Sequence, residues 1–323
     1  MTPEIYHIPA LLEDSINGLN IKPDGIYADV TFGGGGHSRA ILGKLGDNGH
    51  LFGFDRDSDA LKNAPDDPRF TFVHSNFRHI TNFMRYHGVR SLDGILADLG
   101  VSFHHFDDAR RGFSFRSDAP LDMRMNRNAE LTAAVIAESY TASQLEGLFR
   151  AYTDLKRPRA VAESIIKARA SEPIDTTFRL ADAVRPVLNP KSEKKELAQV
   201  FQAFRIEVNG EMEALKRFLN ATAKVICPGG RLAVITYHSI EDRMVKNFMK
   251  TGNIEGKEEK DFFGRTSSPW KQITRSPIVP SEEEIERNPR SRSAKLRIAE
   301  LITPENRNRK WQKKAKTSKK EAG

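Results

Sequence analysis

Asp29-Val-Thr-Phe-Gly-Gly-Gly-Gly-His-Ser38 is the stretch of this sequence that decides the fold. Its four glycines follow an alternating segment, residues 25–31, that predicts a β-strand, and they precede residues 38–45, which predict a helix. A glycine-rich turn between a strand and a helix lets the backbone approach a ligand that any Cβ would obstruct. Open α/β sheets bind ligands at the carboxyl edge of their strands, where such a turn lies. The stretch therefore predicts an α/β domain with a candidate ligand site after its first strand.

More strands follow the glycine turn at regular spacing. They are predicted at residues 49–55, 70–74 and 92–98, and a helix is predicted near residues 79–87. Strands that alternate with helices in this way form right-handed βαβ units and a parallel sheet. The first hundred residues are therefore expected to form a Rossmann-like sheet.

Beyond the fourth strand the pattern changes to helices alone. Between about residues 131 and 207 there is no convincing strand but there are several helix starts, among them the capping box Thr141-Ala-Ser-Gln144. The α/β pattern resumes at Asn209. We expect a helix that ends at Cys227-Pro-Gly-Gly230, then a strand at 231–237, a helix at 241–249 and strands near 270–274 and 294–301.

These patterns predict an α/β fold, a mostly parallel sheet interrupted by an all-helical insertion domain. We expect the first part of the core at residues 1–101, the insertion at 102–213, the second part of the core at 214–302 and a disordered basic tail at 303–323. The tail holds eight Lys or Arg and two Glu, which leaves 43 basic against 41 acidic residues in the rest of the chain. The formal charge of +8 therefore fits a solubilising tail or a tail that attracts phosphates, and composition does not choose between them.

Composition also bears on the compartment. No apolar run approaches the roughly 20 residues that a helix needs to span a bilayer, and the first residues lack the pattern of a signal peptide. Cys227 is the only cysteine, which excludes an internal disulfide and fits a reducing compartment. We expect a soluble cytoplasmic protein without a membrane partner.

Further residues indicate that the glycine turn belongs to a nucleoside-binding site. The dinucleotide fingerprint fits badly because Ser38 or Arg39 stands where its last glycine or alanine is needed, and no G-K-[ST] follows for a P-loop. Asp55 ends the second strand about 20 residues after the glycines, where an acid accepts the ribose hydroxyls of a nucleoside. The alternative for Asp55 is a helix cap, although Asp57 or Ser58 could fill that role. Asp98 ends the fourth strand at the same edge and could orient an amine.

The late segment Pro228-Gly-Gly-Arg-Leu232, before a strand, is typical of class I methyltransferases. Together with the turn and the two acids, it indicates a methyltransferase that uses S-adenosylmethionine. Longer stretches carry a more specific resemblance, to the MraW/RsmH family of bacterial methyltransferases. They are 7–13, 24–33, 35–38, 54–57, 93–102, 111–115, 120–125, 201–206, 237–243 and 288–293.

Family membership would imply N4-methylation of a cytosine in small-subunit ribosomal RNA, with that RNA or the assembled small subunit as partner and a homodimer left open. The core would be a class I methyltransferase fold, and the insertion would recognise the substrate. No metal would be required. The S-adenosylmethionine contacts implied by the resemblance fall on Gly35, Gly36, His37, Asp55, Phe77, Asp98 and His105. At His105 the sequence departs from the family, which usually has Gln in a Ser-Ser-Pro-Gln stretch where this chain reads Ser102-Phe-His-His105.

The chemistry points to particular acids and bases. Methyl transfer needs an in-line approach of the nucleophile, and a cytosine N4 amine is a poor nucleophile that benefits from an acceptor on its N–H. Asp98 is the first candidate for that acceptor, and His238 and Glu241 are weaker ones. Methylation at carbon 5 would need a cysteine that attacks the ring, and Cys227 is expected away from the ligand edge. We therefore expect direct transfer without a covalent enzyme intermediate.

Several alternatives stay open at this point. A noncatalytic RNA-binding assembly factor could keep a nucleoside pocket, and a small-molecule methyltransferase is a second possibility. His104-His-Phe-Asp-Asp108 resembles a metal cluster, but a surface loop is the favoured interpretation. Asp122-Met-Arg-Met125 could be a hinge or a junction packing element. Residues 237–243 follow a strand at the ligand edge and could contact the substrate, or Ser239 could cap a helix there. Basic residues of the insertion that could contact phosphates are Arg110, Arg111, Arg124, Arg127, Lys156, Arg157, Arg159, Lys167 and Arg169.

Overall fold

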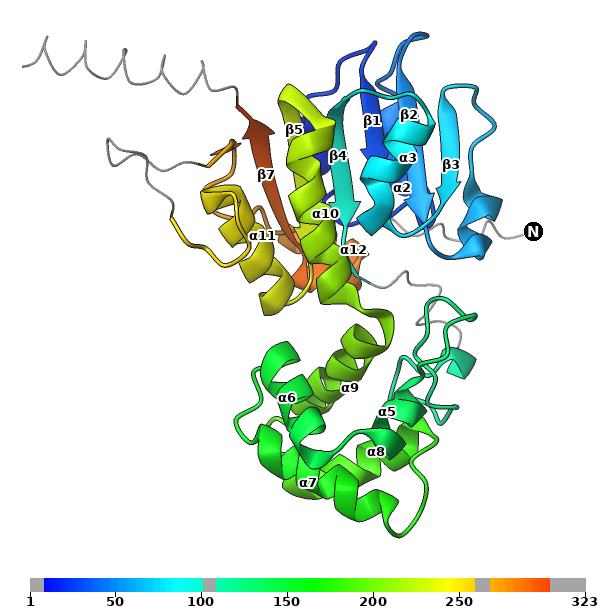
Figure 1. Ribbon diagram of the computed structural model, residues 1–323, viewed down its shortest axis with the longest axis vertical. Coiled ribbons are helices and arrows are strands. Elements are labelled where there is room, and N and C mark those ends of the chain that lie inside the picture. Colours follow the sequence, from blue (N-terminus) through cyan, green and yellow to red (C-terminus); the bar gives the residue numbers. More distant parts are fainter. Residues whose placement is uncertain (1–8, 101–108, 259–267, 303–323) are drawn as a thin grey trace, which may run out of the picture. The chain divides into compact units, whose positions relative to one another are not determined.

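The computed structural model describes residues 9–100, 109–258 and 268–302 of the chain. The chain divides into two compact units (Figure 1). We call Met1–Gly100 with Ala214–Gly323 the sheet unit, and Val101–Glu213 the helical unit. His105 and the His104–Asp108 cluster, like the basic tail, lie outside the described residues.

A seven-stranded sheet in the order β3-β2-β1-β4-β5-β7-β6 forms the centre of the described part of the sheet unit. Its first five strands in sequence run parallel, and β7 is antiparallel to both β5 and β6. The carboxyl ends of the parallel strands therefore meet at one edge, which we call the carboxyl edge. The strands are β1 Ile26–Asp29, β2 His50–Asp55, β3 Phe70–His74, β4 Leu92–Asp98, β5 Ile226–Thr236, β6 Trp270–Gln272 and β7 Lys295–Leu301.

Helices cover both faces of this sheet. Apolar residues of α1 and α2 share one core cluster with Leu51, Leu96 and Ile298 of the strands, whereas Phe54 of β2 contacts Phe83 of α3 on the other face. The helical segments are α1 Leu12–Leu19, α2 Gly36–Leu42, η1 Ser58–Asn63, η2 Phe77–His79, α3 Ile80–Tyr86, α10 Glu211–Val225, α11 Ser239–Thr251, α12 Glu282–Arg287 and η5 Pro289–Ser293. The predicted mostly parallel α/β fold is thus confirmed.

The start of β5 corrects one expectation. We expected a helix to end at Cys227–Gly230 and a strand to begin at Arg231, but α10 ends at Val225 and β5 begins at Ile226. Leu92 of β4 pairs with Ile226, and Gly94 already pairs with Arg231, so the intervening residues bulge out of the ladder. Proline and glycine are tolerated in a strand at such a bulge because the ladder is interrupted there.

The described helical unit contains five α-helices and two short 3₁₀ segments. Their apolar sides meet in one core cluster, in which the rings of Phe149 and Phe204 lie 6.1 Å apart. The predicted capping box is confirmed, because Thr141 and Gln144 exchange bonds at the start of α6. The segments are η3 Ala109–Arg111, α5 Ala133–Ser139, α6 Ala142–Tyr152, α7 Pro158–Arg169, α8 Thr177–Val184, η4 Arg185–Val187 and α9 Glu193–Asn209.

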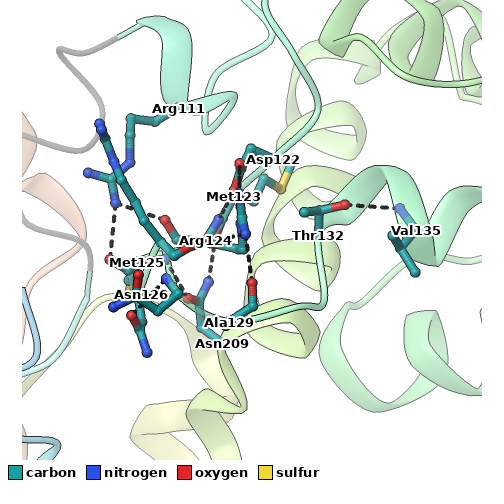
Figure 2. Close-up of polar contacts among 12 residues, drawn as sticks. Arg111, Asp122, Met123, Arg124, Met125, Asn126, Ala129, Thr132, Val135 and Asn209 are labelled. Carbon is teal, nitrogen blue, oxygen red and sulfur yellow. Dashed lines mark hydrogen bonds and ion pairs between the residues drawn. The ribbon is translucent and has the colours of Figure 1, made fainter.

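A buried turn at Asp122–Met125 holds this unit together (Figure 2). Met123 is fully buried and has a φ of 61°, which is unusual for a residue with a side chain. The amide of Asn209 stabilises this conformation from both sides. Its Nδ2 donates to the carbonyl of Met123 at 2.8 Å, and its Oδ1 accepts from the backbone N–H of Met125 at 2.8 Å. Of the hinge and the packing element that the sequence left open, these contacts favour the packing element.

Arginines suggested by sequence as phosphate contacts bind this unit's own backbone instead. Arg111 is buried and donates to the carbonyls of Arg124 and Met125. Arg124 forms a bidentate ion pair with Asp122 and also donates to backbone carbonyls (Figure 2). Arg169 donates to the carbonyls of Ala137 and Tyr140 at the end of α5. For Arg111, Arg124 and Arg169 a structural role therefore accounts for the guanidinium groups.

Candidate active site at the carboxyl edge

The glycine turn follows β1 and leads into α2. Gly33 and Gly35 have φ angles of 51° and 74°, a region that favours glycine. A Cβ on Gly35 would lie 2.9 Å from the ring of Phe32, and one on Gly36 would lie 2.3 Å from Pro9. Gly34 is different, because a Cβ there would meet nothing within 4 Å. The turn is thus closely packed against the protein at Gly35 and Gly36 and open at Gly34.

Asp55 connects the end of β2 to the glycine turn. Its two carboxylate oxygens accept from the backbone N–H groups of Gly33 at 2.9 Å and Asp57 at 2.8 Å. The helix-cap alternative belongs to Asp57, whose side chain accepts from the N–H of Asp59 at the start of η1. Asp55 is therefore held in a fixed orientation next to the turn, at the edge where the sequence placed it.

Asp98 ends β4 beside the same turn. The hydroxyl of Tyr237, just after β5, donates to Asp98 Oδ1 at 2.8 Å, and the Asp98 N–H donates to Thr31 Oγ1 at 2.6 Å. Burial raises the pKa of Asp98 to about 7, an effect that the Tyr237 hydrogen bond opposes and the nearby carboxylates increase. The side chain still keeps 21% of its surface exposed, so a ligand can reach it.

His37, at the start of α2, approaches Asp98 without forming a close ion pair. Its Nδ1 lies 3.8 Å from Asp98 Oδ2, and its side chain is 6% exposed. Burial lowers the pKa of His37 to about 4, so the imidazole is neutral near pH 7. Asp98 therefore receives its hydrogen bond from Tyr237, with a neutral ring beside it.

Asp29 is a third acid at this edge, and it was not identified from the sequence. It ends β1 and is 1% exposed. Its carboxylate accepts from Ser38 Oγ at 2.7 Å and from the Thr31 N–H at 3.2 Å. Burial raises its pKa to about 6. The signal that pointed to Asp55 and Asp98, an acid at the carboxyl end of a parallel strand, applies equally to Asp29.

Phe77 lies at the start of η2, directly after β3 and its following turn. The ring is half-buried and meets Phe218 of α10 edge-on, with centroids 5.2 Å apart. Asn76 caps this segment by accepting from the N–H of Arg78. The fold thus brings Phe77 to the carboxyl edge after β3, where its ring packs on α10.

His238 and Glu241 form the start of α11. The sequence left a cap by Ser239 open, but His238 is the cap of this helix, and its Nδ1 accepts from the N–H of Glu241 at 3.4 Å. Glu241 is 2% exposed, and its Oε2 accepts from the backbone N–H of Tyr237 at 3.0 Å. His238 Nε2 lies 3.0 Å from Glu241 Oε1. These contacts make Glu241 a support for Tyr237, which in turn holds Asp98.

The sequence matches the MraW methylase family over residues 4–302. The chain belongs to this family. It is 60% identical over 298 residues to Ribosomal RNA small subunit methyltransferase H of Parabacteroides distasonis, covering 92% of this chain and 98% of that protein. It is also 59% identical over 295 residues to the protein of the same name from Bacteroides thetaiotaomicron, covering 91% and 97%. The resemblance inferred from the motifs is thereby confirmed, and the fold is that of a class I methyltransferase.

Within this family fold, the predicted site residues fall into two groups. The glycine turn with His37, Asp55, Phe77 and Asp98 reaches the carboxyl edge directly. His238 and Glu241 follow β5 at the same edge but bind the backbone around Tyr237. His105 lies outside the described residues. The described helices are all too short or too polar to cross a membrane.

Proposed function

We propose that this MraW methylase family member transfers a methyl group from S-adenosylmethionine to the N4 amine of a cytosine in small-subunit ribosomal RNA. The names of its relatives support ribosomal RNA of the small subunit as the substrate. The observation that carries the N4 chemistry is the Asp98 carboxylate, buried enough to have a pKa of about 7 but open on one side. Such a group can accept a hydrogen bond from an amine and take up the charge that develops on it.

The carboxyl edge fits S-adenosylmethionine as the methyl donor. The molecule carries a cationic sulfonium and an ammonium group, and Asp98 provides a partly exposed carboxylate at the end of β4, next to the buried Asp29 at the end of the neighbouring strand β1. The open space at Gly34 leaves room at the turn. Asp55 would hold the ribose, and Phe77 would contact the nucleoside base. When bound, S-adenosylmethionine supplies a methyl group that leaves behind a neutral thioether.

Cys227 supports the amine over carbon 5 as the acceptor. Methylation at carbon 5 requires a thiolate that attacks the pyrimidine ring. Cys227 lies in the bulge of β5 next to the Leu92–Ile226 pair, which is at the amino end of β4, opposite the carboxyl edge. Burial raises the pKa of its thiol, and its Sγ lies 3.8 Å from Asp93. The thiol therefore lies away from the acids of the carboxyl edge, Asp29, Asp55 and Asp98, and is not activated as a nucleophile.

The experiment that tests this function uses labelled methyl groups. The protein is incubated with methyl-labelled S-adenosylmethionine and either small ribosomal subunits or their free RNA, taken from cells that lack the gene. Mass analysis of the nucleosides should find the label in N4-methylcytidine. A Cys227→Ser variant should give the same product. Label in 5-methylcytidine that is lost in Cys227→Ser would contradict the proposal, and no transfer to either substrate would favour a noncatalytic assembly factor.

The role of Asp55 gives a prediction on cofactor affinity. Asp55→Ala is expected to weaken S-adenosylmethionine binding by roughly 1.5–3 kcal/mol, since hydrogen bonds to a charged group contribute about this much. Isothermal titration calorimetry measures the change. Asp59→Ala, which removes a half-exposed acid of the same segment, is the matched control and should bind normally. Equal affinity of Asp55→Ala and the parent, with the fold intact, would exclude the ribose role.

Tyr237 gives a prediction on the pH dependence. If the Asp98 anion accepts from the amine, kcat/KM should rise with pH through about 7, the pKa to which burial raises Asp98. Tyr237→Phe removes a hydrogen bond that stabilises the anion, so the pKa of Asp98 should rise by about one unit and the acidic limb should move with it. Tyr27→Phe, which loses a hydroxyl bonded to the N–H of Lys22, is the control and should leave the profile unchanged. An acidic limb that stays in place in Tyr237→Phe would show that Tyr237 does not position Asp98.

A further inference from the structure

The sheet unit carries a basic surface that the proposed reaction does not yet use. The sequence has no Asp or Glu in residues 75–92 or in residues 214–240, although these segments hold seven Lys or Arg. They include all of α3 and most of α10. Segments of this length without an acid are unusual in a chain that is 29% charged. Where their exposed basic residues lie close together, the surface is positively charged.

The helices α3 and α10 lie side by side on one face of the sheet (Figure 1), and Phe77 before α3 meets Phe218 of α10 at 5.2 Å. The apolar residues of these two helices are turned inward. Arg78, just before α3, and Arg85 of α3 are exposed. Burial lowers the pKa of His79, and the positive charges of Arg78 and Arg217 lower it further. The two helices therefore bring positive charge together at their contact.

The outer side of α10 continues this surface. Lys216, Arg217 and Lys224 are exposed, whereas Phe218 and Leu219 between them are buried. The acids of α10 are confined to its first turn, at Glu211 and Glu213. After that turn, the exposed charged residues of the helix are all basic.

A third helix, α11, covers the same face beyond β5. Leu296 and Ile298 of β7 belong to the core cluster beneath α1, so Arg297 between them points to the opposite face, where it binds Asp242 of α11. Both acids of α11 are turned inward: Glu241 is 2% exposed and the side chain of Asp242 is 14% exposed.

The exposed charged residues of α11 are therefore basic as well. They include Arg243, Lys246 and Lys250, of which Lys250 pairs with Glu258 at 2.8 Å. The face under α1 has a different character, since that helix exposes Glu13 and Asp14. The α3–α10–α11 face of the sheet unit therefore differs from the α1 side in that its exposed charged residues are mostly basic.

We propose that the exposed face of the α3–α10–α11 layer binds the phosphate backbone of the RNA substrate. The proposal rests on the proposed function and extends it, because it assigns a contact surface to the catalytic unit itself. Charges spread over three helices match a polyanion that runs across them. Tyr86, 82% exposed, is the large exposed hydrophobic residue of these three helices, and a single aromatic ring suits stacking on a base better than an apolar protein contact.

The direction of the helices links this surface to the site. Since α3 follows β3 and α10 precedes β5, both helices begin at the carboxyl edge, where Phe77 and Asp98 lie. RNA held on this face can therefore pass its bases toward the carboxyl edge without leaving the sheet unit. Phosphate contacts of this kind fix the position of the RNA and carry no sequence information themselves.

The test compares two triple variants of the full chain. Lys216→Ala/Lys224→Ala/Lys246→Ala removes three exposed charges from the layer. Lys44→Ala/Arg287→Ala/Arg292→Ala removes three exposed charges outside the layer, from the turn after α2, from α12 and from η5. Binding to small ribosomal subunits lacking the modification, and to their free RNA, is measured over a range of salt concentrations. S-adenosylmethionine affinity is measured in parallel.

The layer variant should bind RNA roughly tenfold more weakly near physiological salt, and its slope of log affinity against log salt should fall by about two to three units. Its S-adenosylmethionine affinity should match the parent. The inference is overturned if the layer variant keeps the salt slope of the parent, or if the control variant loses as much RNA affinity as the layer variant. If the salt slope falls in the layer variant but the parent transfers no methyl group to the RNA, the proposed function is refuted, whereas the RNA-binding surface is still supported.

Discussion

Asp98→Asn is expected to lower the single-turnover rate of methyl transfer by roughly 10²–10⁴-fold, the usual contribution of a positioned acid or base. The amide keeps the shape of the side chain and can still accept from Tyr237, which donates to Asp98 Oδ1 at 2.8 Å. It cannot take up the positive charge that develops on an attacking amine. The loss should therefore appear in the chemical step, even when S-adenosylmethionine is saturating.

The matched control for this experiment lies on the same strand. Asp93 is the second residue of β4, at the amino edge, where it pairs with Lys22 at 2.7 Å and accepts from the N–H of Ile26. Asp93→Asn should leave the single-turnover rate close to that of the parent. If Asp98→Asn also matches the parent at saturating cofactor, Asp98 lines the pocket without acting on the amine. A loss of S-adenosylmethionine affinity in Asp98→Asn, measured separately, would show only that Asp98 lines the cofactor pocket.

The sequence predicts this edge well because its signals are local. An acid at the end of a parallel strand and a glycine turn after it are both contiguous features, and right-handed βαβ connections place their strand ends at one edge. Asp55 and Asp98 were found in this way, and Asp29 satisfied the same rule. Tyr237 was missed because its role depends on a partner 139 residues away in the sequence. No local pattern around Tyr237 indicates that its hydroxyl meets the end of β4.

Where a sequence rule failed, a specific contact in the fold accounts for the difference. Pro228 and its glycines should stop a helix and precede a strand, but pairing of Ile226 with Leu92 starts β5 earlier and the breakers form a bulge. Ser239 is a common cap residue, but the His238 imidazole accepts from the N–H of Glu241 instead. Arg111 and Arg124 were candidates for phosphate contacts, but both bind backbone carbonyls around the turn at Asp122–Met125.

The ion pair between Arg297 and Asp242 joins α11 to β7 and so supports the segment that carries Tyr237. Arg297 Nε and Asp242 Oδ1 are 2.7 Å apart, a second contact of 3.0 Å makes the pair bidentate, and the two side chains are 6% and 14% exposed. Removing one partner of a buried pair leaves the other charge without compensation, at a cost of about 3–5 kcal/mol. An exposed pair contributes only about 0–1 kcal/mol.

Arg297→Met, which keeps most of the side-chain volume, is therefore expected to lower the free energy of unfolding of the sheet unit by about 3–5 kcal/mol. Denaturant unfolding measures it through Trp270, which packs against Phe248 of α11, in a Trp311→Phe background that leaves Trp270 as the sole tryptophan. Lys62→Met, which breaks an ion pair whose side chains are 79% and 46% exposed, is the control and should cost less than about 1 kcal/mol.

A second substitution separates the lost pair from the charge that is left behind. Asp242→Leu added to Arg297→Met should recover most of the stability, because replacing both partners of a buried pair by apolar groups is often neutral or stabilising. Lys295 Nζ lies 4.0 Å from Asp242 Oδ2, so part of the uncompensated charge in the single variant can be offset by that lysine. A single variant as stable as Lys62→Met would mean that Lys295 replaces Arg297 fully. A double variant no better than the single one would mean that packing of the Arg297 stem, and not the unpaired carboxylate, accounts for the loss.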